Sequence, residues 1–263
     1  MIWAVAGGKG APGATTLTAL LARFWPVPDQ GRVIIEADPE GGVLAARWHA
    51  SAGLTHDPGL LSLAAARDGS AVERLHRHAQ PVSDGVELVA APPSGAQAEA
   101  CLRALGVAAA GALAEADVAC LVDCGRLTPS SPALAWAQRA ERVLLVARPR
   151  LEEVVALGPL AERLQAAGVG VHLVCVGQRP FHPLEVAEVA GISLAGVVAD
   201  DPAAAAVVAR SGLDGRGLVR SRLARSVAEL ACSLTEPAEP VEGGVEPAAA
   251  SDPLAAVVGA VRG

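Results

Sequence analysis

The residues best suited to chemistry lie in a glycine-rich segment near the N-terminus, residues 7–16. This segment contains Lys9, the only lysine in a chain that has twenty arginines. An apolar run, residues 2–6, precedes it, which predicts a strand, a glycine loop and then a helix whose backbone N–H groups point at a phosphate. Because an ammonium is a compact point charge and a guanidinium is a wide planar fork, the single lysine favours contact with a crowded phosphate.

The spacing of this segment matches a phosphate-binding loop at every anchor except one. A full P-loop reads G-x-x-x-x-G-K-[ST], and the chain has Gly8, Gly13, Ala14 and Thr15 in frame. Alanine therefore stands where the lysine that reaches the β- and γ-phosphates is expected. The Thr15 hydroxyl remains available for a magnesium ion, and Thr16 begins a helix whose dipole favours an anion. The alternative is an ordinary glycine-rich turn between a strand and a helix.

Short apolar runs alternate with helix-length segments along the chain. The runs are nearly continuous in apolar character, as expected for strands that are covered on both faces. The predicted strands are residues 2–6, 33–36, 86–90, 119–122, 143–147, 171–176 and 195–198. The predicted helices are residues 14–24, 59–66, 96–116 with a break near Gly106, 151–167, 183–189, 202–210 and 218–232. This alternation predicts an α/β fold, a doubly wound and mainly parallel sheet of about seven strands with helices on both faces.

Composition limits the class of protein. The 263 residues are predicted to form one domain at 1–235, a Pro-, Glu- and Ala-rich linker at 236–252 and a short C-terminal helix at 253–263. Hydrophobic residues make up 52% and aromatic residues 2%, so the core must be built from Ala, Val and Leu. The net charge of −7 argues against a globally basic nucleic-acid-binding protein. We find no signal-peptide pattern and no apolar stretch of bilayer length, which predicts a soluble, cytoplasmic protein.

The stretch from Lys9 to Thr16 resembles the deviant Walker A loop, K-G-G-x-G-K-T-T, of the ParA/MinD-type P-loop ATPases. In that family the first lysine, matching Lys9, crosses a nucleotide-sandwich dimer to the partner's phosphates, and the second, matching Ala14, is the ordinary Walker lysine. The chain is thus similar to a degenerate member that keeps the first lysine and lacks the second. It also departs from the family at Ala11, where the family has glycine, and at Pro12, which has no N–H to donate.

Two further segments carry the resemblance over about the first 235 residues. Residues 36–39 read E-A-D-P and are similar to the D-x-D-P of switch I, which implies that Asp38 positions the attacking water and that Glu36 lies near the magnesium ion. Residues 117–125 are similar to a Walker B strand that leads to switch II. There Asp123 would contact the magnesium ion through its bound water, and Gly125 would offer a backbone amide near the γ-phosphate. Asp38 also suits a simple Asp-Pro turn.

The resemblance implies ATP and Mg²⁺ as cofactors. The catalytic residues it implies are Asp38 and Lys9, and the metal-binding residues, acting directly or through water, are Thr15, Glu36 and Asp123. The nucleotide-binding residues are Gly8, Lys9, Gly10, Gly13, Ala14, Thr15, Thr16, Gly125 and Gln178. Gln178 follows the strand at which the family commonly has an Asn that reads adenine. The turn at residues 200–202 resembles the family's base-side loop and suits a helix N-cap equally well.

The function implied by the resemblance is an ATP-bound switch that forms a homodimer to position a cargo such as a chromosome locus, a pilus or a secretion machine. Losing the charge-assisted phosphate contact at Ala14 costs roughly 1.5–3 kcal/mol in binding and more in a phosphoryl-transfer transition state. We therefore expect slow or absent hydrolysis, with Lys9 acting either within its own subunit or across a dimer. The alternative is a non-hydrolysing adaptor for a secretion or pilus ATPase, and a metabolic kinase-like or reductase-like enzyme is disfavoured because no substrate loop is evident.

Candidate partner surfaces lie in the C-terminal part of the chain. Five arginines could bind DNA non-specifically, although a solvated helix face in an arginine-rich chain is the simpler interpretation: Arg210, Arg216, Arg220, Arg222 and Arg225. Residues 254–261 form an apolar stripe whose single basic neighbour is Arg262. Interfacial membrane helices normally carry several cations, so docking on the body or on a partner protein is favoured over a membrane.

Overall fold

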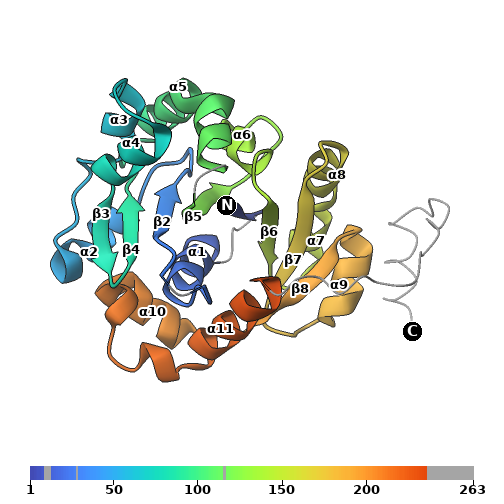
Figure 1. Ribbon diagram of the computed structural model, residues 1–263. Helices are drawn as coiled ribbons and strands as arrows, with labels where there is room; N and C mark the ends of the chain where they lie inside the picture. Colours follow the sequence, from blue (N-terminus) through green and yellow to red (C-terminus); the bar gives the residue numbers. More distant parts are fainter. Residues whose placement is uncertain (9–12, 28, 115–116, 236–263) are drawn as a thin grey trace, which may run out of the picture.

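The computed structural model describes residues 1–8, 13–27, 29–114 and 117–235. These residues form one eight-stranded sheet in the order β3-β4-β2-β5-β1-β6-β7-β8 (Figure 1). The strands are β1 (Ile2–Gly7), β2 (Arg32–Glu36), β3 (Gln80–Ser83), β4 (Val86–Val89), β5 (Ala119–Arg126), β6 (Arg142–Ala147), β7 (Gly170–Val176) and β8 (Ser193–Val198). β3 pairs antiparallel with β4, and the six other neighbouring pairs are parallel. The predicted α/β class with a mainly parallel sheet is confirmed.

The sheet has eight strands where about seven were predicted, because β3 adds an edge strand. Its sequence, Q-P-V-S, includes a proline, and none of its residues is fully buried, so it lacks the continuous apolar run that marks the other strands. Proline is tolerated at such an edge because it has no ladder hydrogen bond to lose there. The Asp84-Gly85 pair that joins β3 to β4, with Gly85 at φ 64°, is the hairpin signal that would have revealed it.

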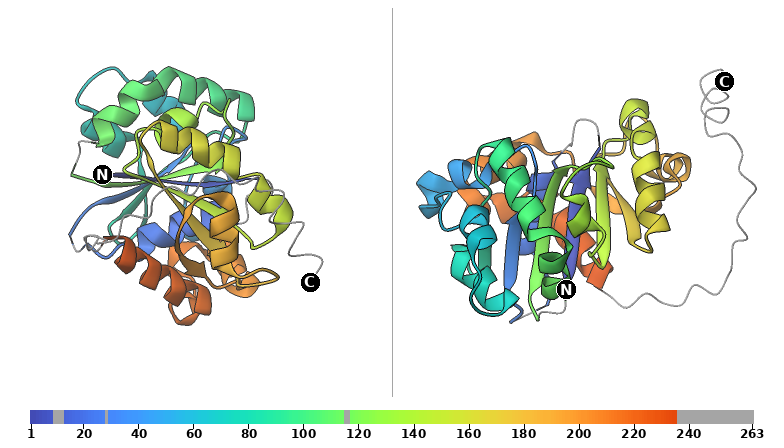
Figure 2. Two further views of the ribbon diagram at one scale, coloured as in Figure 1. Left: turned by 90° about the vertical axis from the view of Figure 1, so that its right-hand side faces the viewer. Right: turned by 90° about the horizontal axis from the view of Figure 1, so that it is seen from above.

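The helices lie in two layers, one on each face of the sheet (Figures 1 and 2). One core packs α3 (Leu60–Ala65), α4 (Ala71–His78), α5 (Gly95–Ala114), α6 (Leu134–Ala137), α8 (Gly158–Ala166) and α9 (Pro183–Ala190) against the sheet. The other packs α1 (Ala14–Arg23), α2 (Leu44–Ala52), α10 (Pro202–Ser211) and α11 (Arg222–Thr235). Along β1, Ile2, Ala4 and Ala6 face the first core while Trp3 and Val5 face the second, as the two-residue period of a strand requires.

Several helix boundaries differ from those predicted. The helix expected at residues 151–167 is two helices, α7 (Leu151–Val155) and α8, because Gly158 and Pro159 begin a new helix. The helix expected at 218–232 is a 3₁₀ turn, Leu218–Arg220, followed by α11, which Ser221 caps through its hydroxyl. Helices α2, α4 and α6 lie in segments to which the sequence assigned no element. The break predicted near Gly106 is confirmed, since that residue has φ 55° and ψ −160° inside α5.

The topology brings the carboxyl ends of β1, β2, β5, β6 and β7 to one edge of the sheet. Strand β1 lies between β5 and β6, and α1 returns across the sheet directly after the glycine-rich segment. This edge is where open α/β folds bind ligands. The predicted linker at 236–252 and the predicted helix at 253–263 lie outside the described residues.

Candidate functional site

The glycine-rich segment joins the end of β1 to the start of α1. Gly13 has φ 81° and precedes Ala14, the first residue of α1, which is buried. Gly8 lies beneath α8, where a Cβ would come within 2.9 Å of the Leu157 side chain. Lys9 and Gly10, together with residues 11 and 12, lie outside the described residues, so the role assigned to Lys9 stays a prediction. The described ends of the segment form a strand, a turn and a helix N-terminus, whose first N–H groups have no partner within the helix.

Asp123 and Thr15 meet at this edge. Asp123 is buried near the end of β5, opposite Val5 of β1. Its carboxylate accepts a hydrogen bond from the Thr15 hydroxyl and a second, of 3.0 Å, from the Gly125 backbone N–H. Burial raises the pKa of Asp123 to about 7, and the nearby charges of Glu36 and Asp38 act in the same direction. The structure therefore brings together the threonine and the aspartate that the sequence proposed as magnesium ligands.

Asp38 lies against Gly125, so the loop after β2 packs on the last residues of β5. Gly125 has φ 54°, and a Cβ there would collide with the Asp38 carboxylate. The Asp38 Oδ1 accepts a hydrogen bond from the Glu40 N–H at 2.9 Å, so the Asp-Pro turn is also present. Burial raises the pKa of Asp38 from its usual value. The close approach explains why glycine is needed at position 125, because a left-handed conformation and a missing side chain are both required.

Glu36 holds a loop in place. It is buried, and its Oε1 accepts hydrogen bonds of 2.8 Å from the N–H groups of Val43 and Leu44, while its Oε2 accepts one of 3.0 Å from Ala91. Burial raises the pKa of Glu36 despite these three bonds, which act in the opposite direction. The side chain thus fixes the start of α2 beside the end of β4. To lie near a magnesium ion as predicted, the Glu36 carboxylate would have to contact the ion while it also accepts these three hydrogen bonds.

The donor set fits a magnesium ion that is held jointly with phosphate oxygens. No group of three or more His, Cys, Asp or Glu side chains among the described residues is arranged to hold a metal ion. Magnesium is usually bound by one or two protein oxygens together with water and substrate phosphates. Thr15 and Asp123 supply a hydroxyl and a carboxylate of that kind, and the three carboxylates close to this point would be relieved by a cation.

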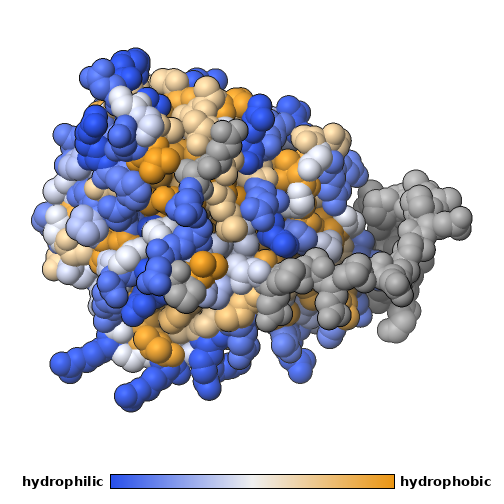
Figure 3. All heavy atoms as spheres, in the orientation of Figure 1, coloured by the Kyte–Doolittle hydropathy of each residue, from blue (hydrophilic) through white to orange (hydrophobic). Residues whose placement is uncertain are grey.

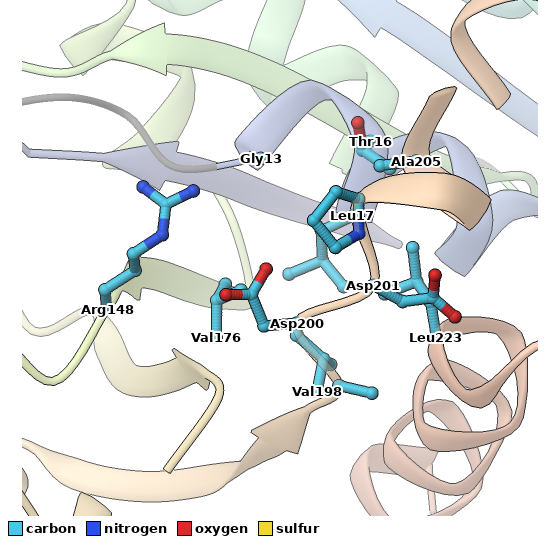
Figure 4. A pocket seen from close by; sticks show the side chains of 12 residues that line it. Gly13, Thr16, Leu17, Arg148, Val176, Val198, Asp200, Asp201, Ala205 and Leu223 are labelled. Carbon is cyan, nitrogen blue, oxygen red and sulfur yellow. The ribbon is translucent and has the colours of Figure 1, made fainter. Parts of the chain in front are cut away.

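A cavity of about 310 Å³ opens beside the start of α1, toward the ends of β7 and β8 (Figure 4). It is lined by Gly13, Thr16, Leu17, Arg148, Val176, Val198, Ala199, Asp200, Asp201, Pro202, Ala205 and Leu223. Asp201 caps α10 by accepting a hydrogen bond of 3.0 Å from the Ala204 N–H, so the turn at 200–202 lines the cavity and caps the helix. Gln178 is exposed and is not among the described residues that line this cavity.

Arg148 is a site residue that the sequence reasoning missed. It directly follows β6 and is the only cationic residue among the described residues that line the cavity. The signal that could have found it is its position at the carboxyl end of a predicted central strand, immediately before Pro149. The cation that the sequence pattern indicates, Lys9, lies inside the glycine-rich segment, and Arg148 is more than a hundred residues away from it.

The arginine cluster lies on the face of the sheet that α10 and α11 cover. All five arginines are exposed, and Figure 3 shows hydrophilic side chains projecting along the lower edge of the molecule, where these helices lie in Figure 1.

His76 and His78 lie in α4, and the His76 Nδ1 contacts the Glu87 carboxylate at 2.5 Å. In the part of the chain that the structure describes, no helix combines the length and apolar character needed to cross a membrane.

Comparison with solved structures decides the fold. The chain superposes on the MinD cell-division ATPase of Pyrococcus furiosus with a TM-score of 0.70 and 20% identity, covering 89% of this chain and 97% of that one. The ParA-family ATPase of Chlorobium tepidum gives 0.68 and 16%, covering 89% and 98%. The chain has the fold of the ParA and MinD ATPases. MinD of Pyrococcus horikoshii, solved with Mg-ADP, gives 0.69 and 18%, covering 89% and 96%. No protein-family model and no curated protein sequence matches the chain.

Proposed function

We propose that the chain is a nucleotide-binding switch of the ParA/MinD type, which binds ATP with Mg²⁺ and forms a homodimer that positions a cellular cargo. The observation that carries this proposal is the contact of Asp38 with Gly125, beside the hydrogen bond between Thr15 and Asp123. This contact joins the loop after β2 to the end of β5, at the edge where α1 begins. A ligand that moves the loop must therefore change its packing on β5, which is the behaviour expected of a switch.

Different groups among the described residues bind different parts of the nucleotide. The backbone N–H groups of Gly13, Ala14, Thr15 and Thr16 at the start of α1 bind phosphate oxygens, assisted by the helix dipole. The Thr15 hydroxyl and the Asp123 carboxylate hold Mg²⁺, which offsets negative charge on the phosphates when bound. Gly125 offers its backbone near the terminal phosphate, and Asp38 orients a water molecule there. A purine and ribose occupy the cavity beside α10.

Hydrolysis by this site is proposed to be slow. Ala14 provides no charge to the phosphates, and charge on the transferring group is what the missing lysine would offset in the transition state. Lys9 is proposed to act across a dimer on the partner's phosphates. The second candidate function is a non-hydrolysing adaptor for a secretion or pilus ATPase. The absence of a lysine at position 14 favours it too, since Ala14 is buried and uncharged.

The cargo is proposed to be a protein component of a partitioning, pilus or secretion system. One solved structure of the same fold, from Aquifex aeolicus, is a complex of MinD with MinC; it has a TM-score of 0.63 and 12% identity, and covers 92% of this chain and 98% of that one. Non-specific DNA is the second candidate partner, through the five exposed arginines on α10, α11 and the turns between them. A contact with DNA phosphates would weaken steeply as salt is raised.

Equilibrium binding of ATP in the presence of Mg²⁺ tests the proposal. The wild-type chain should bind ATP at millimolar concentration or below, and Asp123→Ala should weaken binding only when Mg²⁺ is present. The variant Glu229→Ala, on the exposed side of α11, serves as a control for loss of a carboxylate. If the wild-type chain binds no nucleotide at millimolar ATP and Mg²⁺, the switch is excluded and the adaptor remains.

A further inference from the structure

We propose that Arg148 supplies, within the same subunit, the phosphate-binding cation that Ala14 does not provide. This inference rests on the proposed nucleotide-binding function and names a residue of that site. The ligand it predicts is a nucleoside diphosphate or triphosphate whose phosphate chain lies between the start of α1 and the end of β6.

The sheet places Arg148 beside the glycine-rich segment. Strand β6 pairs with β1 in parallel, with Val146 opposite Gly7. Both strands end at the same edge of the sheet, and Arg148 is the second residue after Val146. In Figure 4 its side chain extends toward the start of α1, where Gly13 is labelled. A cation on the neighbouring strand can therefore serve the same phosphates as a lysine at position 14.

Glu153 accepts a hydrogen bond from the Arg148 backbone and forms a long ion pair with its guanidinium. The Glu153 Oε2 accepts a hydrogen bond of 2.7 Å from the Arg148 backbone N–H, and Glu153 is itself buried in α7. The Arg148 Nη1 lies 3.9 Å from the Glu153 Oε1, which is too long for a hydrogen bond. Among the described residues the guanidinium makes no hydrogen bond, so its five N–H donors remain for a ligand.

The cavity has opposite charges at its two ends. Arg148 lies at the end of β6, whereas Asp201 lies beyond β8, on the far side of the cavity, and the Asp200 carboxylate lies between them in Figure 4. Asp201 uses its Oδ1 on the Ala204 N–H, and Asp200 is exposed with its Cβ 3.4 Å from the Cβ position of Gly177. Phosphates are attracted to the first end and repelled by the second. Ribose hydroxyls and base amino groups, which donate hydrogen bonds, suit the carboxylate end.

This polarity distinguishes a nucleotide from inorganic phosphate. A free phosphate would satisfy Arg148 and the start of α1 but leave the rest of a 310 Å³ cavity without a ligand. That volume is within the range of small-molecule sites. The remaining walls, which include Val176, Val198 and Leu223, are apolar, as a purine ring requires. The site as a whole therefore matches a molecule that is anionic at one end and apolar with hydrogen-bond donors at the other.

Nucleotide affinity of matched arginine variants tests the proposal. We expect Arg148→Gln to raise the Kd for ADP and for ATP with Mg²⁺ by about 10- to 100-fold, the usual effect of losing a charge-assisted hydrogen bond. Arg148→Lys keeps the charge but not the planar, forked guanidinium, so its Kd should lie between those of the wild type and Arg148→Gln. The control is Arg150→Gln, because Arg150 is exposed, two residues away, and outside the described lining of the cavity; its Kd should match that of the wild type.

Two further readouts separate a phosphate contact from a purely structural role. The salt dependence of binding should become shallower in Arg148→Gln, because one phosphate contact is lost. In an Ala14→Lys background, Arg148→Gln should raise the Kd by a smaller factor, because the new ammonium serves the same phosphates. Thermal midpoints of all variants identify any loss of nucleotide affinity that is caused by unfolding. If Arg148→Gln unfolds, the Kd of Arg148→Lys tests the role of Arg148 instead.

The outcomes are distinct. If the wild type binds nucleotide and Arg148→Gln binds it equally well, with the same salt dependence, the role of Arg148 is excluded and the proposed function stands. If the wild type binds no nucleotide at millimolar concentration, the proposed function fails and the inference fails with it.

Discussion

Ala14 occupies the first position of α1, and the first turn of that helix forms without a lysine. The Leu17 N–H donates to the Gly13 carbonyl at 2.8 Å, and the Thr18 hydroxyl donates to the Ala14 carbonyl at 3.0 Å. The N–H groups of a first turn have no intrahelical partner and favour an anion. At the residue scale, phosphate binding therefore depends on backbone dipoles at this helix and on cations that come from elsewhere.

Restoring the lysine should strengthen nucleotide binding. We expect Ala14→Lys to lower the Kd for ATP with Mg²⁺ by roughly 10-fold or more, because a charge-assisted hydrogen bond to phosphate is gained. Ala14→Gln has a similar length without the charge and controls for bulk at a buried position. Isothermal titration measures both. Equal affinities of the wild type and Ala14→Lys would show that the phosphates do not lie over the first turn of α1.

Asp123 should make the protein without ligand less stable as the pH rises. Its pKa is about 7 in the folded chain and 3.8 in its ordinary state, so the folded state binds more protons than the unfolded state between these values. The free energy of unfolding must then fall as the pH rises from about 4 to 7, and level off above 7. Asp123→Asn removes this dependence and should be more stable than the wild type at pH 8, by on the order of 1–4 kcal/mol.

Thermal midpoints of the wild type and Asp123→Asn at pH 5 and pH 8, in EDTA, check this expectation. The difference between the two proteins should grow from pH 5 to pH 8. Glu229→Gln, on the exposed side of α11, controls for the loss of one carboxylate. A difference that is constant with pH would mean that Asp123 is ionised throughout the range.

At the scale of elements, a loop and a strand are joined by a contact that a single glycine permits. The loop after β2 presents Asp38, and its carboxylate occupies the space where a Cβ at Gly125, near the end of β5, would lie. Glu36 then fixes the far end of that loop to α2 and β4 through three backbone N–H groups. Asp38 and Glu36 thus connect the loop after β2 to β5, α2 and β4.

Substitution of Gly125 by alanine should be more damaging than the same change at an open glycine. Gly125→Ala combines a left-handed φ with a collision against Asp38, whereas Gly53→Ala has φ 67° with nothing within 4 Å. We expect about 1 kcal/mol of destabilisation at Gly53 from the backbone alone and clearly more at Gly125. Chemical denaturation measures both. Asp38→Ala should remove most of the excess, and equal losses at the two glycines would contradict the packing of Asp38 on Gly125.

The sequence revealed the elements that carry strong local signals. Strand β1, the turn at Gly13 and helix α1 follow from an apolar run and glycine spacing, and Asp123 follows from its place at the end of a buried strand. The edge strand β3 was missed because its few residues lack an apolar run. Arg148 was missed because its place in the site depends on the pairing of β6 with β1, which brings together residues far apart in the chain. The three backbone partners of Glu36 depend on loop geometry that has no short-range pattern.

At the scale of the whole molecule, the eight-stranded sheet places every described site residue at one edge and leaves the arginine cluster on the face that α10 and α11 cover (Figures 1 and 3). An edge that opens to solvent lets a second copy approach the phosphates directly. Lys9, as the resemblance implies, would then act on the partner's nucleotide. The proposed function thus makes assembly depend on nucleotide, and assembly can be measured without knowledge of the cargo.

The most direct test is the molar mass of the protein in solution with and without ATP and Mg²⁺, measured by light scattering after size-exclusion chromatography. Without nucleotide we expect the 26.4 kDa of one chain, and with ATP and Mg²⁺ twice that mass. Lys9→Ala should bind ATP yet remain a single chain, while Arg150→Gln should behave as the wild type. A wild-type mass of one chain at an ATP concentration that saturates the site would contradict the account.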